Sequence, residues 1–185
     1  AARAEVEASI RRLFAYGAWA DKYDGAAHAV PLRGQALALP EPLGVVGVIA
    51  PEEAPLLGFI SLTAPLVAMG NRIVAVPSQA HPLSATDLYQ VLDTSDVPGG
   101  VFNIVTGESA SLARTLAEHD GVDALWYVGL AAGGAEVERL STGNLKQIWS
   151  NYGRRRDWYD PLQGEGREYL RRATQVKNIW IPYGE

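Results

Sequence analysis

Apolar positions in the middle of the chain fall into short runs rich in β-branched residues, separated by longer segments in which apolar residues recur with helical spacing. The short runs predict strands and the longer segments predict helices. Regular alternation of the two predicts an α/β fold, in which a five-stranded, mainly parallel sheet carries helices on both faces. The predicted strands span residues 45–49, 72–76, 101–105, 122–128 and 145–150, and the predicted helices lie near 55–69, 82–94, 108–118 and 133–141.

The first predicted helix, residues 2–23, has the apolar spacing of an amphipathic surface helix. Charged residues, Arg12 among them, lie largely off its apolar face. Asp24 and Gly25 predict the end of this helix, and a second short helix is predicted at residues 165–172. The residues on the apolar face of the first helix are Val6, Ile10, Leu13, Phe14 and Gly17.

Two segments outside the alternating region are predicted to be extended. Residues 28–39 carry apolar positions on both sides of a turn at Arg33 and Gly34, which predicts a β-hairpin. Residues 174–183 alternate between two partly apolar faces, which predicts a strand. A short chain cannot cover both faces of such a strand, and an open strand edge is a template for pairing with another chain. The predicted interface residues are Val30, Leu32, Leu37, Leu39, Val176, Ile179, Trp180 and Ile181.

The net charge of the chain argues against a nucleic-acid partner. The 185 residues carry a net charge of −5, and the basic cluster at residues 154–156 is typical of a solvated loop. The longest apolar stretch, residues 54–69, is too short and too broken by proline to span a bilayer. No signal peptide is recognisable and cysteine is absent, so the chain is predicted to be cytoplasmic. The histidines, whose spacing predicts no metal site, are His28, His81 and His119.

Two groups of residues suggest chemistry, and each has a simpler structural explanation. Gly129 and Gly134 could hold a pyrophosphate at a helix N-terminus, but a strand-to-helix turn needs glycine for its own geometry, and we favour the turn. Glu52 and Glu53 could form a paired-carboxylate site. We instead expect both at a helix start, where the helix dipole favours negative charge. The weak candidates for contact with a cofactor are Ser78, Gly129 and Gly134.

Several segments resemble aldehyde dehydrogenases and follow one another in the order of that family. The collinear segments are residues 16–25, 41–49, 64–71, 77–78, 82–83, 97–107, 122–123 and 143–146. The greatest similarity, at residues 51–55 and 173–185, is to the second domain of family sixteen, whose members carry two tandem aldehyde dehydrogenase-like domains. The resemblance implies a Rossmann-like cofactor domain, an oligomerisation flap, and a catalytic domain with a nucleophilic cysteine after residues 144–153.

The chain departs from the pattern of that family at the positions that carry its chemistry. The asparagine that stabilises the reaction oxyanion is replaced by Glu53, and the lysine at the cofactor ribose by Val76. The Thr-Gly-Ser turn beside the pyrophosphate is replaced by Val128, Gly129 and Leu130, and the general-base glutamate by Asn151. With no cysteine in the chain, no covalent thiohemiacetal can form on it. The resemblance therefore implies no catalytic residue, no enzyme activity and no bound cofactor.

These observations together predict a catalytically inactive, aldehyde dehydrogenase-like module with a structural role in oligomerisation. The predicted partner is a second copy of the chain, joined through the flap strands, or a covalently linked catalytic aldehyde dehydrogenase domain, with no nucleic acid and no membrane. The alternatives are a residual NAD-binding domain without catalysis and an engineered oligomeric building block. The predicted division is an N-terminal helix (1–25), an oligomerisation hairpin (26–42), a degenerate NAD-binding-like Rossmann domain (43–153), and a C-terminal linker, helix and oligomerisation strand (154–185).

Overall fold

A five-stranded parallel sheet forms the centre of the molecule. The computed structural model describes residues 2–31 and 33–183. The strand order is β5-β4-β3-β6-β7, and each neighbouring pair is parallel. The predicted α/β fold with a parallel sheet is therefore confirmed. The strands are β3 (Val45–Ile49), β4 (Arg72–Val76), β5 (Phe102–Ile104), β6 (Ala124–Tyr127) and β7 (Gln147–Ser150).

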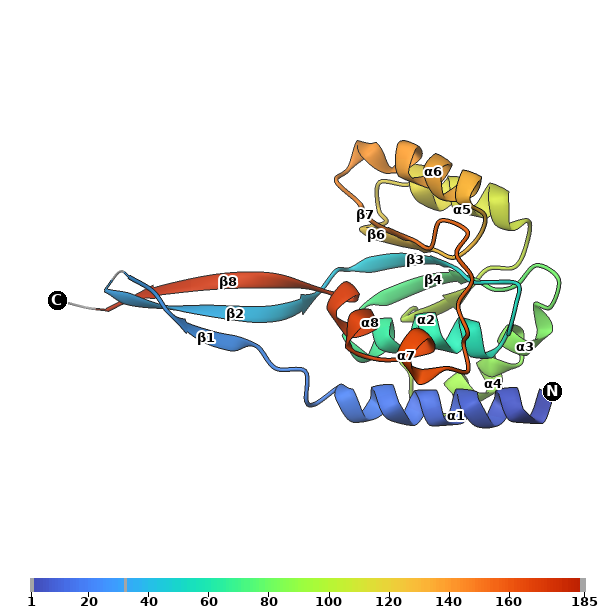
Figure 1. The fold of residues 1–185 in the computed structure, drawn as a ribbon, viewed down its shortest axis with the longest axis horizontal. Helices are drawn as coiled ribbons and strands as arrows, with labels where there is room; N and C mark the ends of the chain where they lie inside the picture. The colour runs from blue at the N-terminus through green and yellow to red at the C-terminus, as the bar shows by residue number, and fades with distance from the viewer. Residues whose placement is uncertain (1, 32, 184–185) are drawn as a thin grey trace.

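Helices cover both faces of this sheet, as predicted (Figure 1). One face carries α1 (Ala2–Trp19), α2 (Leu57–Ala68), α3 (Leu83–Thr86), α4 (Leu88–Asp93), α7 (Pro161–Gly164) and α8 (Arg167–Arg172). The other face carries α5 (Ser109–Glu118) and α6 (Ala131–Leu140), followed by the 3₁₀ turn η1 (Ser141–Gly143). Side chains alternate between the faces along β3, so that Val46 and Val48 join the core on the α2 side and Ile49 joins the core on the α5 side.

The single helix predicted at residues 82–94 is two short helices, α3 and α4. At their junction the amide of Gln90 donates to the carbonyl of Asp87, three residues earlier, at 3.3 Å. This bond replaces the four-residue spacing of a continuous α-helix, so the ladder breaks there.

The prediction for the apolar face of α1 is wrong, because that face points to solvent. Val6, Ile10 and Leu13 are between 39% and 48% exposed, and Phe14 is 76% exposed. The buried residues of α1 are Ala8, Ser9, Arg12 and Tyr16. Small side chains at Ala8 and Ser9 suit a close approach to α2, with which α1 makes most of its contacts.

Arg12 explains why α1 packs through its more polar side. Its Nε donates to Oε2 of Glu165 at 2.9 Å, and its Nη2 donates to the carbonyl of Trp158 at 3.0 Å. Its Nη1 donates to Ser61 on α2 and to the carbonyl of Gly164. The guanidinium therefore joins α1 to α2 and to the segment that contains α7. A buried charge needs such partners, and here they determine which face of the helix is turned inward.

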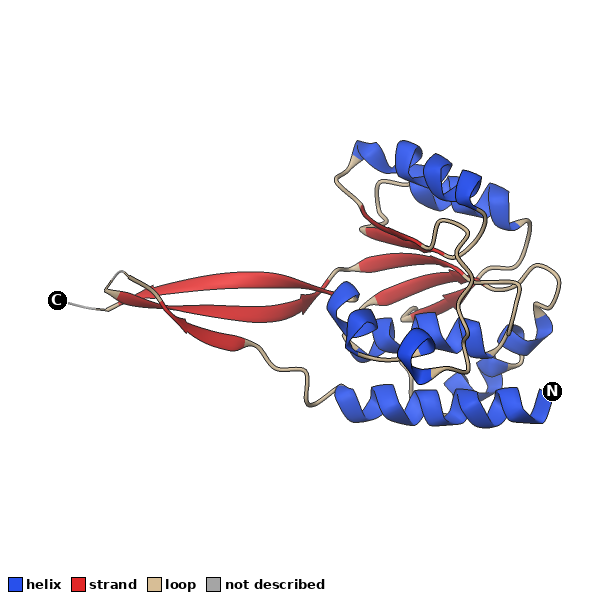
Figure 2. Ribbon diagram, in the orientation of Figure 1, coloured by secondary structure: helices blue, strands red, loops and turns tan. Residues whose placement is uncertain are grey.

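A second sheet projects away from the helices and the parallel sheet (Figures 1 and 2). It contains β1 (Ala26–Ala29), β2 (Gly34–Pro42) and β8 (Thr174–Pro182), in the order β1-β2-β8 with both pairs antiparallel. The predicted hairpin and the predicted C-terminal strand are thus parts of one sheet, which we call the flap. Most of β8 is exposed. The predicted division of the chain into four parts stays a prediction.

The described residues include no helix that is both long enough and apolar enough to cross a membrane.

Candidate functional site

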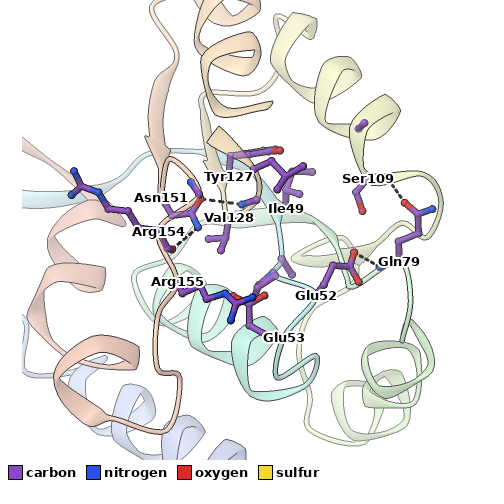
Figure 3. Close-up of a pocket in the computed structure, with 16 residues that line it drawn as sticks. Ile49, Glu52, Glu53, Gln79, Ser109, Tyr127, Val128, Asn151, Arg154 and Arg155 are labelled. Carbon is purple, nitrogen blue, oxygen red and sulfur yellow. Dashed lines mark hydrogen bonds between the residues drawn. The ribbon is translucent and has the colours of Figure 1, made fainter. Parts of the chain in front are cut away.

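A cavity lies where β3, β6 and β7 end and the chain turns into the following segments (Figure 3). It has a volume of about 450 Å³. Strand order in the sheet reverses between β3 and β6, because β4 and β5 lie to one side of β3 and β6 and β7 to the other. In open α/β sheets, ligands bind outside the carboxyl ends of the strands at such a reversal. The position of the cavity is therefore that of a ligand site.

Glu52 closes one side of the cavity by binding the loop after β4. Its carboxylate accepts hydrogen bonds from the hydroxyl of Ser78 at 2.5 Å, the amide of Gln79 at 3.0 Å and the amide of Ala80 at 3.1 Å. Partial burial would raise the pKa of Glu52, but these three hydrogen bonds outweigh it and lower the pKa below its ordinary value. Ser78, the weak cofactor candidate, is thus occupied by a carboxylate of the same chain.

The expectation that Glu52 and Glu53 sit at a helix start is wrong. Helix α2 begins at Leu57, and its first free amides, those of Leu56 and Leu57, donate to the carboxylate of Glu5 at 2.9 Å and 3.0 Å. The negative charge at this helix start therefore comes from α1, about fifty residues earlier in the chain. No local pattern around residue 52 could have indicated it.

Gly129 in the β6–α6 turn, and Gly133 and Gly134 in the first turn of α6, pack closely against the side chains of Tyr127 and Ser150. A Cβ atom on Gly129 would lie 2.6 Å from the Tyr127 hydroxyl oxygen, and one on Gly133 would lie 2.0 Å from the same atom. A Cβ atom on Gly134 would lie 2.4 Å from Oγ of Ser150. Close packing thus accounts for these glycines without a ligand.

The polar groups of the turn do not fit a dinucleotide pyrophosphate. Residue 130, the N-cap of α6, is a leucine that is 79% exposed, and residues 128–132 contain neither a charged nor a hydroxyl side chain. Val76 is buried and apolar. Two carboxylates, Glu52 and Glu53, line the cavity together with Arg154 and Arg155, so the lining has no net positive charge to attract phosphate. The Arg155 side chain approaches the cavity near Glu53 (Figure 3).

Asn151 acts as a clamp between the β6–α6 turn and the segment after β7. Its Oδ1 accepts from the amide of Gly129 at 3.0 Å, and its Nδ2 donates to the carbonyl of Arg154 at 2.9 Å. The two residues that follow, Tyr152 and Gly153, are left-handed, with φ of 49° and 73°. Sequence reasoning missed this clamp, although asparagine before such a turn is a known signal for it.

The predicted interface residues that the structure describes lie on or beside the flap. Leu39, Val176, Trp180 and Ile181 are exposed, whereas Val30, Leu37 and Ile179 are partly buried. Leu32 lies outside the described residues. The three histidines lie apart, and no group of three metal-ligating side chains occurs among the residues described.

Comparison with known proteins identifies the fold and its relatives. Residues 1–156 match the model of the aldehyde dehydrogenase family. The chain belongs to the aldehyde dehydrogenase family. It is 34% identical to betaine aldehyde dehydrogenase of Bacillus subtilis (strain 168) over 134 residues, which cover 72% of this chain and 27% of that protein. It is 36% identical to hydroxyisobutyraldehyde dehydrogenase of Mycolicibacterium austroafricanum over 129 residues, which cover 70% of this chain and 26% of that protein.

The structural comparison agrees with this assignment. The crystal structure of PnpE from Pseudomonas sp. WBC-3 superimposes with a TM-score of 0.76 at 31% identity, covering 79% of this chain and 30% of that one. The chain therefore spans about a quarter to a third of the length of the aldehyde dehydrogenases that it matches. The Rossmann-like fold inferred from the sequence is confirmed.

The expectation that this chain is not an enzyme is contradicted by its relatives. The matching family and the similar proteins are aldehyde dehydrogenases, which are enzymes. The 134 and 129 matched residues cover 27% and 26% of these two relatives, so catalytic residues missing from this chain do not exclude it from an enzyme family.

Proposed function

We propose that this part of an aldehyde dehydrogenase-family protein acts in assembly, with the flap joining a sheet of another polypeptide. The observation that carries the proposal is the exposure of the β8 strand. Val176 is 64% exposed, Trp180 60% and Ile181 45%. Burying each of these side chains would contribute roughly 1.5–3 kcal/mol. A projecting sheet with exposed apolar side chains gains that free energy when a partner covers it.

The hydrogen-bond pattern defines the edge that the partner would use. The amide of Tyr183 donates to the carbonyl of Arg33, and β2 and β8 are antiparallel. Backbone groups of successive residues alternate in direction along an antiparallel strand. The amides of Val176, Asn178 and Trp180 therefore point away from β2, toward the open edge of β8. An incoming strand could pair with these three amides.

The prolines in β2 are consistent with this pattern of hydrogen bonds between β2 and β8. Pro40 is opposite Val176 and Pro42 is opposite Thr174, both at positions that form no hydrogen bond between β2 and β8. Proline lacks an amide hydrogen, so it is tolerated at such positions. The ladder between β2 and β8 is consequently continuous, and β8 can serve as a preformed template.

The partner of the isolated chain is a second copy, with β8 pairing to β8 in a symmetric dimer. In a longer polypeptide the flap would instead pair with a catalytic aldehyde dehydrogenase domain. The two cases share the same open edge and the same exposed residues, so one variant tests both.

Replacing Asn178 with proline tests the proposal. Asn178→Pro removes one outward amide and leaves the bonds between β2 and β8 in place, whereas Asn178→Ala keeps the amide and serves as the control. We expect sedimentation analysis at micromolar concentration to give a dimer or larger assembly for the original chain and for Asn178→Ala, and a monomer for Asn178→Pro. A monomeric original chain would refute the assembly function.

Residual dinucleotide binding is the competing function, favoured by the cavity of about 450 Å³ at the reversal of strand order. Calorimetric titration with NAD distinguishes the two. A dissociation constant below about 100 μM, or roughly −5.5 kcal/mol, would favour cofactor binding over a purely structural role.

A further inference from the structure

A second cavity, which shares Asn151 and Arg154 with the one at the strand ends, lies beside the open edge of β7. Its volume is about 360 Å³, and Trp149 of β7, Arg172 of α8 and the loop residues Arg154 and Arg156 line it. Within the described residues, β7 pairs with β6 on one side and with no strand on the other. The cavity therefore combines a free strand edge with several cationic side chains.

Two of the guanidinium groups are held in place by the same indole ring. The Cζ atom of Arg172 lies 4.6 Å from the centre of the Trp149 ring, and that of Arg156 lies 5.2 Å from it. Arg156 also donates to the carbonyl of Gln163 at 2.9 Å and to the hydroxyl of Tyr169 at 3.2 Å. Stacking and hydrogen bonding fix the orientation of these forks before a ligand arrives, which reduces the entropic cost of binding.

The guanidinium groups of Arg172 and Arg156 each keep N–H donors that form no hydrogen bond with a described residue. Arg172 uses Nε for Glu168, at 3.1 Å, and its two terminal nitrogens have no hydrogen bond among the described residues. Nε and Nη2 of Arg156 and the side-chain nitrogens of Arg154 likewise have no hydrogen bond among the described residues. Figure 3 shows the Arg154 side chain turned away from the first cavity and the Arg155 side chain turned toward it.

Charge defines the ligand class. Three guanidinium groups and the carboxylate of Glu168 line this cavity, which gives it a formal charge of +2 in a chain whose net charge is −5. The edge of β7 adds neutral donors. The amides of Gln147 and Asn151 donate to β6, so the alternation of a parallel ladder turns the amides of Ile148 and Ser150 toward the open edge.

We infer that this cavity binds the dianion of a phosphate monoester. Fixed guanidinium forks match the oxygen geometry of phosphate and form two hydrogen bonds per arginine. Backbone amides bind phosphate oxygens in the same way. A ligand charge of about −2, which a phosphate monoester carries above its second pKa of about 6, balances the charge of the cavity.

Phenyl phosphate is the probe for this inference, and benzenesulfonate, a monoanion of similar shape, is the charge control. Amide chemical shifts of the ¹⁵N-labelled chain are followed at constant ionic strength and at pH 7.5. We expect shifts at Ile148, Ser150 and the Trp149 indole with phenyl phosphate, and binding at least tenfold weaker with benzenesulfonate. Lowering the pH to 5 is expected to weaken phenyl phosphate binding as the dianion takes up a proton.

Matched arginine variants locate the site. Arg172→Gln and Arg154→Gln are each expected to weaken phenyl phosphate binding about tenfold or more, which is the loss of one charge-assisted hydrogen bond. Arg155→Gln removes the same charge on the side of the other cavity and is expected to change binding less than twofold. Arg154 makes no side-chain hydrogen bond among the described residues, so its variant is expected to fold normally.

Three results would overturn the inference. The first is no shift at Ile148 or Ser150 at 20 mM phenyl phosphate, and the second is equal binding of benzenesulfonate. The third is an equal loss of phenyl phosphate affinity for Arg155→Gln and Arg172→Gln. That result would mean that the ligand is held by non-specific charge attraction or binds in the first cavity. Circular dichroism of each variant shows whether it is folded.

Discussion

Glu52 is a carboxylate that orders a loop rather than a helix. It accepts three hydrogen bonds from residues 78–80, and these lower its pKa despite the opposing effect of burial. A lowered native pKa means that the folded state favours the ionised form. The stabilisation is therefore complete above the ordinary pKa of 4.5 and is lost as the pH falls through the lower native value.

Hydrogen exchange at the amides of Gln79 and Ala80 measures this contribution. Protection of both amides, corrected for intrinsic exchange, is expected to be constant above about pH 5 and to fall at lower pH. Glu52→Ala is expected to remove the pH-dependent part, while Glu53→Ala leaves it unchanged. Because Glu52 is largely exposed, global stability should change by less than about 1 kcal/mol. Identical profiles for the two variants would contradict the role of Glu52.

At the scale of elements, α1 is held by a buried arginine rather than by its apolar stripe. Arg12 is 3% exposed and bonds to residues from α2 and from the α7 segment, while Phe14 is 76% exposed. Removing one partner of a buried pair leaves its acceptors without donors. The position of α1 therefore depends on one side chain more than on hydrophobic contacts.

Replacing Arg12 with alanine is expected to lower the free energy of unfolding by about 3–5 kcal/mol. The adjacent Arg11→Ala is the control, because Arg11 is exposed, and it should change stability by less than about 0.5 kcal/mol. Phe14→Ser should be equally mild. Urea denaturation measures all three. A larger loss for Phe14→Ser than for Arg12→Ala would mean that the apolar face of α1 is the packed one.

An element can be predicted from the sequence when the interactions that form it involve residues close together in the chain. Strands 45–49 and 72–76 were predicted with their observed bounds, since strands covered on both faces read as continuous apolar runs. The inward face of α1 depends on Glu165, which lies 153 residues beyond Arg12, and the start of α2 depends on Glu5. Such long-range partners leave no trace in a local pattern. The same applies to Arg156, in the loop after β7, and to Arg172, in α8, which both stack on Trp149 of β7.

At the scale of the whole molecule, the two sheets differ in how they are stabilised. The parallel sheet lies between two layers of helices, whereas the flap has no layer of helices over either face (Figure 2). An antiparallel sheet with little core of its own is marginal in water. The flap is therefore the part of the molecule whose stability should depend most on a partner.

Hydrogen exchange across a range of protein concentrations tests this dependence and identifies the pairing edge. At concentrations below assembly, the outward amides of Val176, Asn178 and Trp180 should exchange nearly unprotected. At concentrations that favour assembly, they should become as protected as the inward amides of Lys177 and Ile179.

Amides of β3 and β4 serve as the internal control and should exchange at rates independent of concentration, because their ladders are complete within one chain. Protection that rises only at Lys177 and Ile179 would mean that copies pack face to face, with the edge of β8 left open. That outcome would refute strand addition, because a strand paired at the open edge must occupy the three outward amides. The outward and inward amides of a single strand thus distinguish the two modes of assembly within one experiment.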